Sequence, residues 1–396
     1  MARMSDDPQM PFGFGGLDPE SLRDAPLFRE LQRVMAGSHG PVNWELARQV
    51  GVATAVESGD DDAPTADEQR TFEEAVRVAE LHVGRLTGLT PPGRIATTTL
   101  LRRSGWVTAT IESLHPLLRS AAARMSEALE RATREQLPPE ASGATALIGQ
   151  LGPLLQGTQI GQVFGGLSHH LGARYDLWLP APEPTHLVFV PSNIAAFERD
   201  WSIDPTEYRT FVALHEVAVA SGFAAPWVEV RFAELVDDYL VGYAIDVERI
   251  RTALEGFDPS NPESLQGLGV EDGAVFGPVL DAEQRIKLAR VQAFLAAAEG
   301  YADHVRDAIV AELLPGSSKI HEARRRHREE HPIGPSLERL LGVELPAELP
   351  ARGRRFCDEV AASADETTLA RMWESAEAMP SLPELEEPIL WLARTG

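Results

Sequence analysis

Apolar residues recur every three or four positions along most of this chain, which is the spacing of amphipathic α-helices. The first half carries the pattern over residues 21–37, 42–56, 68–86, 104–132 and 141–176. The second half carries it over residues 205–223, 226–246 and 281–314, and shorter helical runs follow. Residues 1–24 are rich in Gly, Pro and Asp, so we predict that this segment is disordered.

The helical pattern is interrupted near the middle of the chain. Residues 177–179 and 186–190 are short β-prone runs that flank a proline-rich connection. We predict that these two runs pair as a small hairpin. The fold class expected from the whole pattern is therefore mainly α with a small β element.

Capping residues mark where several helices begin. Asp204 precedes Pro205, a pairing of N-cap and first-turn proline that is common at helix starts. Asp281 is followed three residues later by Gln284, which is the spacing of a capping box. Asp67 is placed to cap the helix that follows it. We therefore expect helices to start at these three aspartates.

Four glycines recur at roughly helical spacing in the segment 141–176, at positions 157, 161, 165 and 166. A glycine has no Cβ, so it allows another backbone to approach closely. The segment lacks the strand and acid context of a phosphate-binding glycine loop. The glycines therefore predict close packing of one helix against another.

Composition narrows the possible functions. The chain has 396 residues, 43% of them hydrophobic and 24% charged, so a sizeable core is possible. Its net charge of -24 argues against nucleic acid or an anionic membrane as the main partner. The single cysteine, Cys357, excludes a disulfide framework and a thiolate zinc cluster. The sequence shows neither a signal peptide nor a membrane-spanning apolar run, so we expect a cytoplasmic protein.

The stretch FVALHEVAVA, residues 211–220, holds a His-Glu pair inside an apolar helical run. In zinc proteases such a pair opens an H-E-x-x-H motif, whose histidines bind one ion and whose glutamate is the general base. Here the position of the second histidine is Val219. His215 and Glu216 are therefore candidates for a ligand and a base. The alternative is a hydrogen-bonded core histidine beside a glutamate that pairs with an arginine.

A second candidate element lies in the long helix predicted at 281–314. The segment AEGYAD places Glu299 and Asp303 four residues apart, on one face of a largely apolar helix. One family of zincins uses this spacing, with the Asp orienting a zinc-binding histidine. Two uncompensated carboxylates in a core would be costly, so we expect a metal, a cation or donors beside them. The alternatives are salt bridges to arginines such as Arg306, or exposure to solvent.

Two further groups of histidines have weaker patterns. His327 and His331, in HREEH, have the inverted zincin spacing H-x-x-E-H. Arginines crowd this segment, at 324, 325, 326 and 328. Because their charges would repel a dication, we interpret the segment as a solvated, charged helix end. His169 and His170 are adjacent in the sequence and cannot share one face of a helix.

Several blocks of the sequence, taken in order, resemble a known family. They are RSGWVTATIESLHPLL, GARYDLWLP, HLVFVPSNIAAFERDW, FVALHEVAVA before APWVEVRF, AAAEGYADHVRDAI, and the C-terminal stretch from RRFCDEVAAS to ILWLAR. Together they cover most of the chain from about residue 40 onward. The sequence is similar to the zincin-like metallopeptidase family of actinobacteria and their relatives. Members of this family are often labelled hydrolases or F420-biosynthesis-associated proteins.

The resemblance implies a zincin-like metallopeptidase core embedded in a helical domain. We expect a helical region at 25–175, the zincin-like core at 176–345, and a C-terminal helical segment at 346–396 that packs on the core. The family label names no cofactor residues, and no F420-binding residues can be identified in the sequence.

The resemblance also assigns roles to individual residues. His215 matches the first zinc ligand, and Glu216 matches the general base that deprotonates a zinc-bound water. Glu299 matches a downstream acidic ligand, with Asp303 as the carboxylate that supports the zinc site from outside. The second histidine ligand has no match, because Val219 cannot coordinate an ion.

These features support two main hypotheses. The first is a metallopeptidase-like protein whose zinc site is weakened or lost, which is impaired or non-catalytic and acts by binding a peptide or a protein partner. The second is an active zinc-dependent peptidase that keeps Glu216 as base and uses a substitute ligand such as His304 or His186. A third, simpler view is a helical structural protein whose acidic groups are all salt-bridged. The sequence does not specify substrate, pathway or oligomeric state.

Overall fold

The computed structural model describes residues 40–57, 59, 61–89, 97–136, 142–244 and 280–396. The segment 1–24 and the helical run predicted at 21–37 lie outside the described residues. The expected fold class is confirmed, because helices dominate the structure and the described sheet has two strands.

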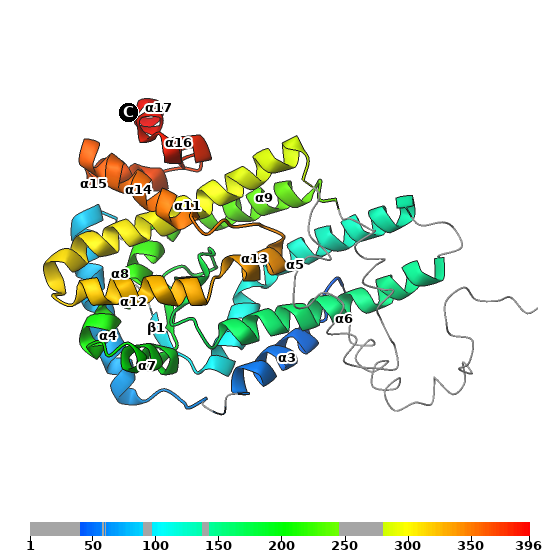
Figure 1. Ribbon diagram of the computed structural model, residues 1–396, viewed down its shortest axis with the longest axis horizontal. Helices are drawn as coiled ribbons and strands as arrows, with labels where there is room; N and C mark the ends of the chain where they lie inside the picture. The colour runs from blue at the N-terminus through cyan, green and yellow to red at the C-terminus, as the bar shows by residue number, and fades with distance from the viewer. Residues whose placement is uncertain (1–39, 58, 60, 90–96, 137–141, 245–279) are drawn as a thin grey trace, which may run out of the picture.

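The elements follow one another along the chain as shown in Figure 1. The first group is α3 (Trp44–Val56), α4 (Ala66–Thr87), β1 (Thr97–Leu100), α5 (Arg103–Gln136), α6 (Ser142–Leu167), the 3-10 turn η2 (Arg174–Leu177) and β2 (His186–Phe189). The second is α7 (Pro191–Asp200), α8 (Pro205–Phe223), α9 (Val228–Leu240), α11 (Ala282–Leu313), α12 (Ser317–Glu330) and α13 (Gly334–Leu341). The C-terminal group is α14 (Leu349–Ser363), α15 (Glu366–Ala370), η5 (Arg371–Trp373), α16 (Leu382–Glu386) and α17 (Pro388–Thr395).

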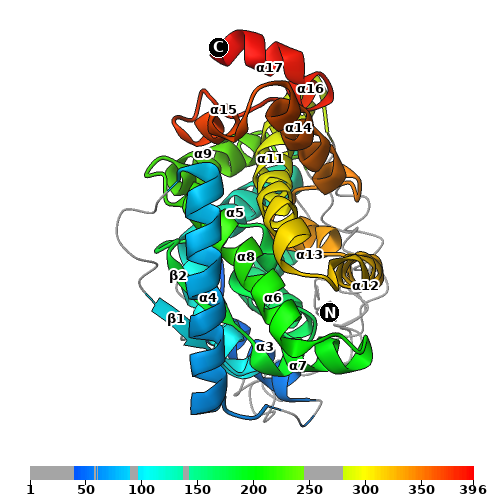
Figure 2. The same cartoon turned by 90° about the vertical axis from the view of Figure 1, so that its left-hand side faces the viewer.

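The helix α8 is the centre of the fold. Every residue from Phe211 to Phe223 is buried, and α8 contacts α4, α7, α11 and β2. Figure 2 shows α4 and α11 lying close to α8. A helix that is covered on all sides must be apolar all round. His215 and Glu216 are therefore polar exceptions in an otherwise hydrophobic core helix.

Two of the three expected helix starts are confirmed. The side chain of Asp204 caps α8 and that of Asp281 caps α11, each accepting hydrogen bonds from backbone N–H groups of the first turn. The prediction that Asp67 caps its helix is wrong. Thr65 is the N-cap of α4 and forms a capping box with Glu68. The helix starts two residues earlier than expected, which places Asp67 in the first turn, where its negative charge interacts favourably with the helix dipole.

The predicted hairpin is also wrong. Residues 174–177 form the turn η2, and Trp178 after it has a positive φ of 60°. Among the described residues, the antiparallel contact of β2 is a single bridge from Phe189 to Ala173, which lies before the predicted first run. The strand β2 instead pairs in parallel with β1, a strand much earlier in the chain, with Thr97 opposite His186 and Leu100 opposite Phe189.

The glycines of α6 form a close contact with α3. A Cβ added to Gly157 would lie 2.5 Å from the carbonyl oxygen of Asn43, and one added to Gly161 would lie 2.5 Å from that of Ala47. A Cβ added to Gly165 would lie 2.5 Å from the Cβ of Thr54 in α3. The prediction of close helix packing is thus confirmed for these three glycines. A Cβ added to Gly166 would have no neighbouring atom within 4 Å, so this glycine is not part of the close contact.

A second close crossing joins α11 to α14. A Cβ on Gly300 would lie 2.1 Å from the backbone carbon of Gly353, and a Cβ on Gly353 would lie 1.7 Å from the carbonyl oxygen of Ala296. The two backbones are therefore in contact at the turn of α11 that carries Glu299. The C-terminal segment is built onto the central helices at this point.

Membrane-spanning potential is limited among the described residues. No single described helix is both long and apolar enough to cross a bilayer. The pair α8 and α9 reaches that length and composition together, but the two helices meet at an angle of 81°.

The two neighbouring glycines of α6 provide a matched test of the α3–α6 contact. We expect Gly165→Ala to lower the free energy of unfolding by about 1–3 kcal/mol, because the new methyl group overlaps α3. Gly166→Ala fills open space in a helix and should be neutral or raise stability by up to ~1 kcal/mol. Urea unfolding of both variants measures the difference, and equal effects would contradict the close contact.

Candidate metal centre

The candidate centre lies where the middle of α8 meets the middle of α11. His215 is 4% exposed and Glu216 is fully buried. Glu299 and Asp303 lie one turn apart on α11 and are also buried. His215 Nε2 lies 3.3 Å from Glu299 Oε2. The fold therefore brings together three residues that the sequence had placed in two separate elements.

These three residues form a group with the composition of a metal site. His215, Glu299 and Asp303 each offer one ligand atom, and these atoms all lie within 4.8 Å of one another. Among the described residues, no fourth His, Cys, Asp or Glu joins this group. Val219 lies one turn after His215 on α8 and is buried. An apolar side chain thus stands one helical turn from the imidazole, where the motif has its second histidine.

Arginines hold the two acids of this group. Arg328 Nη2 donates to Glu299 Oε1 at 2.6 Å, and its Nη1 donates to Asp303 Oδ2 at 3.3 Å. Arg306 Nη1 donates to the other oxygen of Asp303. The salt bridge suggested for Arg306 is present, and Arg328 is a further partner that the sequence did not identify. Two guanidinium groups therefore face two carboxylates.

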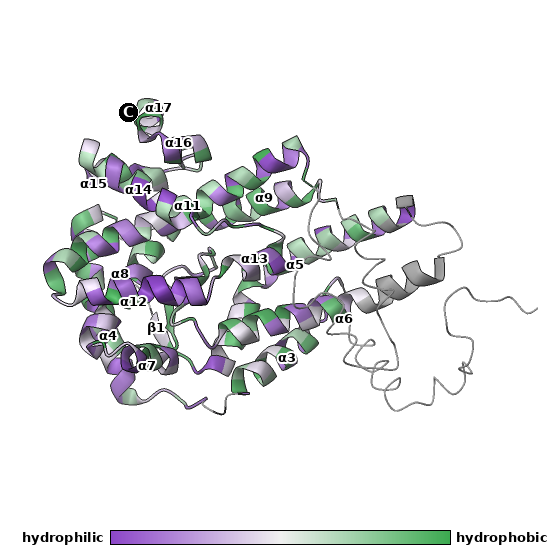
Figure 3. Ribbon diagram, viewed as in Figure 1, coloured by the Kyte–Doolittle hydropathy of each residue, from purple (hydrophilic) through white to green (hydrophobic). Residues whose placement is uncertain are grey.

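From the sequence alone, we interpret the HREEH segment and the arginines around it as a solvated helix end. This interpretation is wrong for two of the four arginines. Figure 3 shows hydrophilic residues along α12. Arg324 pairs with the buried Asp176 at 2.8 Å, and Arg328 reaches into the candidate centre. Arg325 and Arg326 remain more than half exposed and pair with Glu322 on the same helix. The spacing of four residues explains the division, since it puts residues 324 and 328 on one helix face.

Glu216 is held by the backbone of the turn η2. The N–H of Tyr175 lies 3.1 Å and 3.2 Å from the two carboxylate oxygens of Glu216. A Glu216 oxygen lies 3.6 Å from His215 Nδ1, which is the ring nitrogen that faces away from Glu299. The imidazole therefore lies between two carboxylates. Burial raises the pKa of Glu216 to about 7, although the nearby His215 opposes this shift.

The charges around His215 favour its protonated form. Burial alone would lower the pKa of His215, but the charge of Glu299 and hydrogen bonds to both neighbouring glutamates outweigh burial and raise it to about 9. Burial alone would raise the pKa of Asp303, but the guanidinium groups of Arg306 and Arg328 hold it well below its usual range. The centre is therefore a compact network of opposite charges.

The two proposed substitute ligands lie elsewhere. The ring nitrogens of His304 are bound by Asp358 at 2.6 Å and by Glu366 at 3.0 Å, toward the C-terminal helices. His186 is on β2, where its Nε2 lies 2.8 Å from Thr99 Oγ1 on β1. The structure brings neither histidine into the group formed by His215, Glu299 and Asp303.

A comparison with models of known protein families assigns this chain to a family. The model of the family described as zincin-like metallopeptidase matches residues 42–392. The chain belongs to this zincin-like metallopeptidase family. The resemblance seen in the sequence is thereby confirmed.

A solved structure shows the same fold as this zincin-like protein. It is the crystal structure of a "putative hydrolase with a novel fold" from Chloroflexus aurantiacus, with a TM-score of 0.63 and 23% sequence identity. The match covers 89% of this chain and 98% of the other. At this identity the likeness concerns the fold alone. A search of curated proteins gave no match.

Two residues with defined roles at the centre were missed in the sequence. Asp176 accepts hydrogen bonds from the N–H groups of Gly172 and Ala173 and pairs with Arg324, so it fixes the turn that holds Glu216. It lies in the block GARYDLWLP, within the turn η2 itself. Arg328 was visible only as one of several arginines in a charged run. Its distinguishing signal was its position four residues after Arg324.

The charge network predicts a specific dependence on pH. His215 has a folded pKa of about 9, above its ordinary value of 6.5. The stability that it contributes is therefore fully present below about pH 6.5 and is lost as the pH rises through about 9. We expect the free energy of unfolding to fall by roughly 2–3 kcal/mol across this window. Urea unfolding of the wild type and of His215→Gln tests this, and equally steep loss in both would contradict it.

The role of Arg328 can be tested against a matched arginine. Arg328→Gln removes a cation from two buried carboxylates, so we expect a loss of roughly 1–3 kcal/mol in the free energy of unfolding. The side chain of Arg328 is 32% exposed, which keeps the loss below that of a fully buried pair. Arg325→Gln, on the solvent side of the same helix, should change stability by less than about 0.5 kcal/mol. Equal effects of the two substitutions in thermal or urea unfolding would show that Arg328 is not part of the centre.

Proposed function

We propose that this zincin-like protein does not use the His215–Glu299 centre for zinc catalysis and acts instead by binding a peptide or a partner protein. The observation that carries the proposal is the hydrogen bond of Arg328 to Glu299 Oε1 at 2.6 Å. A guanidinium group here neutralises the acid that would otherwise be a metal ligand.

The number of side-chain atoms left to coordinate an ion supports this proposal. Both oxygens of Asp303 accept hydrogen bonds from arginines, and one oxygen of Glu299 accepts from Arg328. His215 Nε2 and Glu299 Oε2 are then the ligand atoms left for an ion. Catalytic zinc sites ordinarily use three protein ligands and a water. With Val219 at the remaining motif position, the donor set does not fit such a site.

The charges around the centre also disfavour a bound zinc ion. The two acids of α11 already face two arginines, so a bound dication would add two positive charges, while Glu216 is one further buried acid beside His215. Zinc would have to displace Arg328 and leave its guanidinium without its carboxylate partners. Breaking this partly buried ion pair is unfavourable, because it leaves Glu299 and Asp303 without one of their cations.

The position of Glu216 also supports a non-catalytic centre. A general base must lie within hydrogen-bond reach of the water that it deprotonates. Both oxygens of Glu216 face the N–H of Tyr175, on the side of the imidazole away from Glu299. Glu216 thus serves as an acceptor that ties α8 to the turn η2.

The partner that we propose is a peptide or a protein. A net charge of -24 disfavours a polyphosphate such as nucleic acid. A cytoplasmic location remains part of the same proposal.

One observation favours the rival function, an active zinc-dependent peptidase. The ligand atoms of His215, Glu299 and Asp303 lie within 4.8 Å of one another, and the protein belongs to a family described as metallopeptidase-like. In that case the three residues would hold zinc after Arg328 moves away, and Glu216 would supply the base. Metal content distinguishes the two functions.

Zinc measured by elemental analysis, in protein purified without chelators, tests the proposal. We expect the His215→Ala substitution to leave the zinc content of the protein unchanged. The double variant Val219→His, Arg328→Gln should gain close to one equivalent of zinc that depends on His215, because it adds a ligand and frees Glu299. Val219→His combined with Arg326→Gln is the matched control, since Arg326 lies on the solvent side of α12. Stoichiometric wild-type zinc that disappears in His215→Ala would establish the rival function instead.

A further inference from the structure

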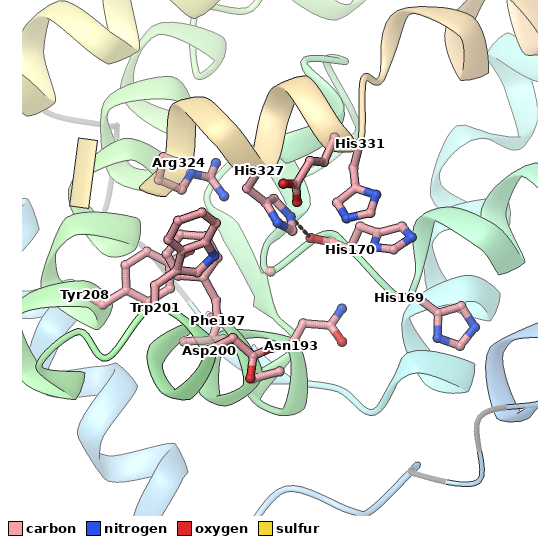
Figure 4. A pocket seen from close by; sticks show the side chains of 14 residues that line it. His169, His170, Asn193, Phe197, Asp200, Trp201, Tyr208, Arg324, His327 and His331 are labelled. Carbon is pink, nitrogen blue, oxygen red and sulfur yellow. Dashed lines mark hydrogen bonds between the residues drawn. The ribbon is translucent and has the colours of Figure 1, made fainter. Parts of the chain in front are cut away.

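Four histidines that the candidate centre does not use line one cavity. His169 and His170 lie in the turn after α6, while His327 and His331 lie at the C-terminal end of α12. The cavity has a volume of about 370 Å³. Figure 4 shows the histidines along one side of the cavity and the aromatic rings of Phe197, Trp201 and Tyr208 along the other. Two histidine groups that are far apart in the sequence therefore meet in space.

Three of these imidazoles are close neighbours. The rings of His170 and His331 stack with their centroids 3.7 Å apart and their planes at 14°. The centroids of His327 and His331 are 4.8 Å apart, and those of His170 and His327 are 6.3 Å apart. His327 lies in the last turn of α12, and His331 is the residue that caps its C-terminal end.

One ring has the orientation that metal-binding histidines commonly have. His327 Nε2 lies 3.1 Å from the backbone carbonyl oxygen of His170. A carbonyl oxygen only accepts, so Nε2 carries the proton and Nδ1 carries the lone pair. Histidines that bind metals usually donate their other ring N–H to a carbonyl or carboxylate in this way. The lone pair at Nδ1 of His327 is therefore available to an ion.

Two imidazoles of the cavity, those of His170 and His327, favour their neutral form. Burial, together with the neighbouring His331 and His327, lowers the pKa of His170 to about 4. Burial also lowers the pKa of His327, although its bond to the His170 carbonyl opposes the shift. Neutral imidazole is the form that coordinates metals, so these rings have lone pairs at neutral pH.

The arginines of α12 are paired with carboxylates, although Arg324 lines the cavity and its charge lowers the pKa of His327. Arg324 is paired with Asp176, and Arg328 is paired with Glu299 and Asp303. Arg325 and Arg326 both pair with Glu322 on the outer face of the helix. Each of these four arginines thus has a carboxylate partner, with Glu322 shared by Arg325 and Arg326. The carboxylate of Glu330 also lines the cavity, beside His331.

We propose that His170, His327 and His331 form a binding site for a divalent transition-metal ion of the kind that prefers imidazole ligands, such as Zn²⁺ or Co²⁺. The site is separate from the His215 centre and does not rest on the function proposed above. Its formation requires the exposed ring of His331 to leave its stack on His170 and to turn its lone pair toward Nδ1 of His327. The cavity provides room for this rotation.

Cobalt binding tests the site in full-length protein without a histidine tag. The protein is stripped of metal with a chelator, which is then removed, and titrated with Co²⁺ alone while visible absorption is followed. We expect saturable binding of one equivalent that Zn²⁺ displaces. His331→Gln and His327→Gln should each weaken binding by at least ~10–100-fold.

Two controls make the assignment specific. His321→Gln changes another histidine of α12, which lies outside the cavity against Phe211 and Asp307, and should leave binding unchanged. His215→Gln should also leave it unchanged, since that residue belongs to the other centre. His331 is exposed, so His331→Gln should keep the wild-type thermal unfolding.

Three outcomes would overturn the proposal. They are the absence of saturable cobalt absorption, wild-type affinity in the double variant His327→Gln, His331→Gln, and loss of binding in His215→Gln alone. The first two leave the proposed function of the His215 centre intact, because they concern the cavity. The third assigns the ion to the His215 centre and contradicts both proposals.

Discussion

The structure depends on how the two buried carboxylates of α11 are neutralised. Glu299 and Asp303 lie in the core, where an unpaired charge would destabilise the fold by several kcal/mol. A metal ion and a pair of guanidinium groups are two physical solutions to the same problem. In this chain Arg328 and Arg306 supply the second solution. The ion pairs of Arg328 tie α12 to the centre, and the proposal that the centre holds no zinc rests on them.

The same constraint organises the helices around the centre. The glycine crossing of Gly300 and Gly353 brings α14 against α11, and Arg354 of α14 then donates to the backbone carbonyl of Asp303 at 2.8 Å. On the opposite side, Glu216 ties α8 to the turn η2, whose conformation is fixed by Asp176. The acid pair is therefore enclosed by elements that each contribute a partner for a buried charge or a backbone group.

Family membership explains the fold and leaves the chemistry to individual side chains. The family match extends over residues 42–392, whereas the proposed loss of zinc catalysis turns on Val219 and Arg328. Under this proposal the chain keeps the central helices of the fold, while salt bridges take the place of metal coordination at its centre. The histidine cavity shows the opposite case, in which potential metal ligands lie together outside the family's motif.

The sequence determined the features that depend on neighbouring residues. Helical periodicity, the caps at Asp204 and Asp281, and the placement of Glu299 and Asp303 on one helix face all follow from local geometry and hydrogen bonds. The tertiary structure alone decided the parallel partner of β2, the role of Arg328 and the meeting of His170 with His331. These contacts join residues that are distant along the chain. Residue spacing shows which side chains share a face, but only packing decides which opposite charge or ring meets that face.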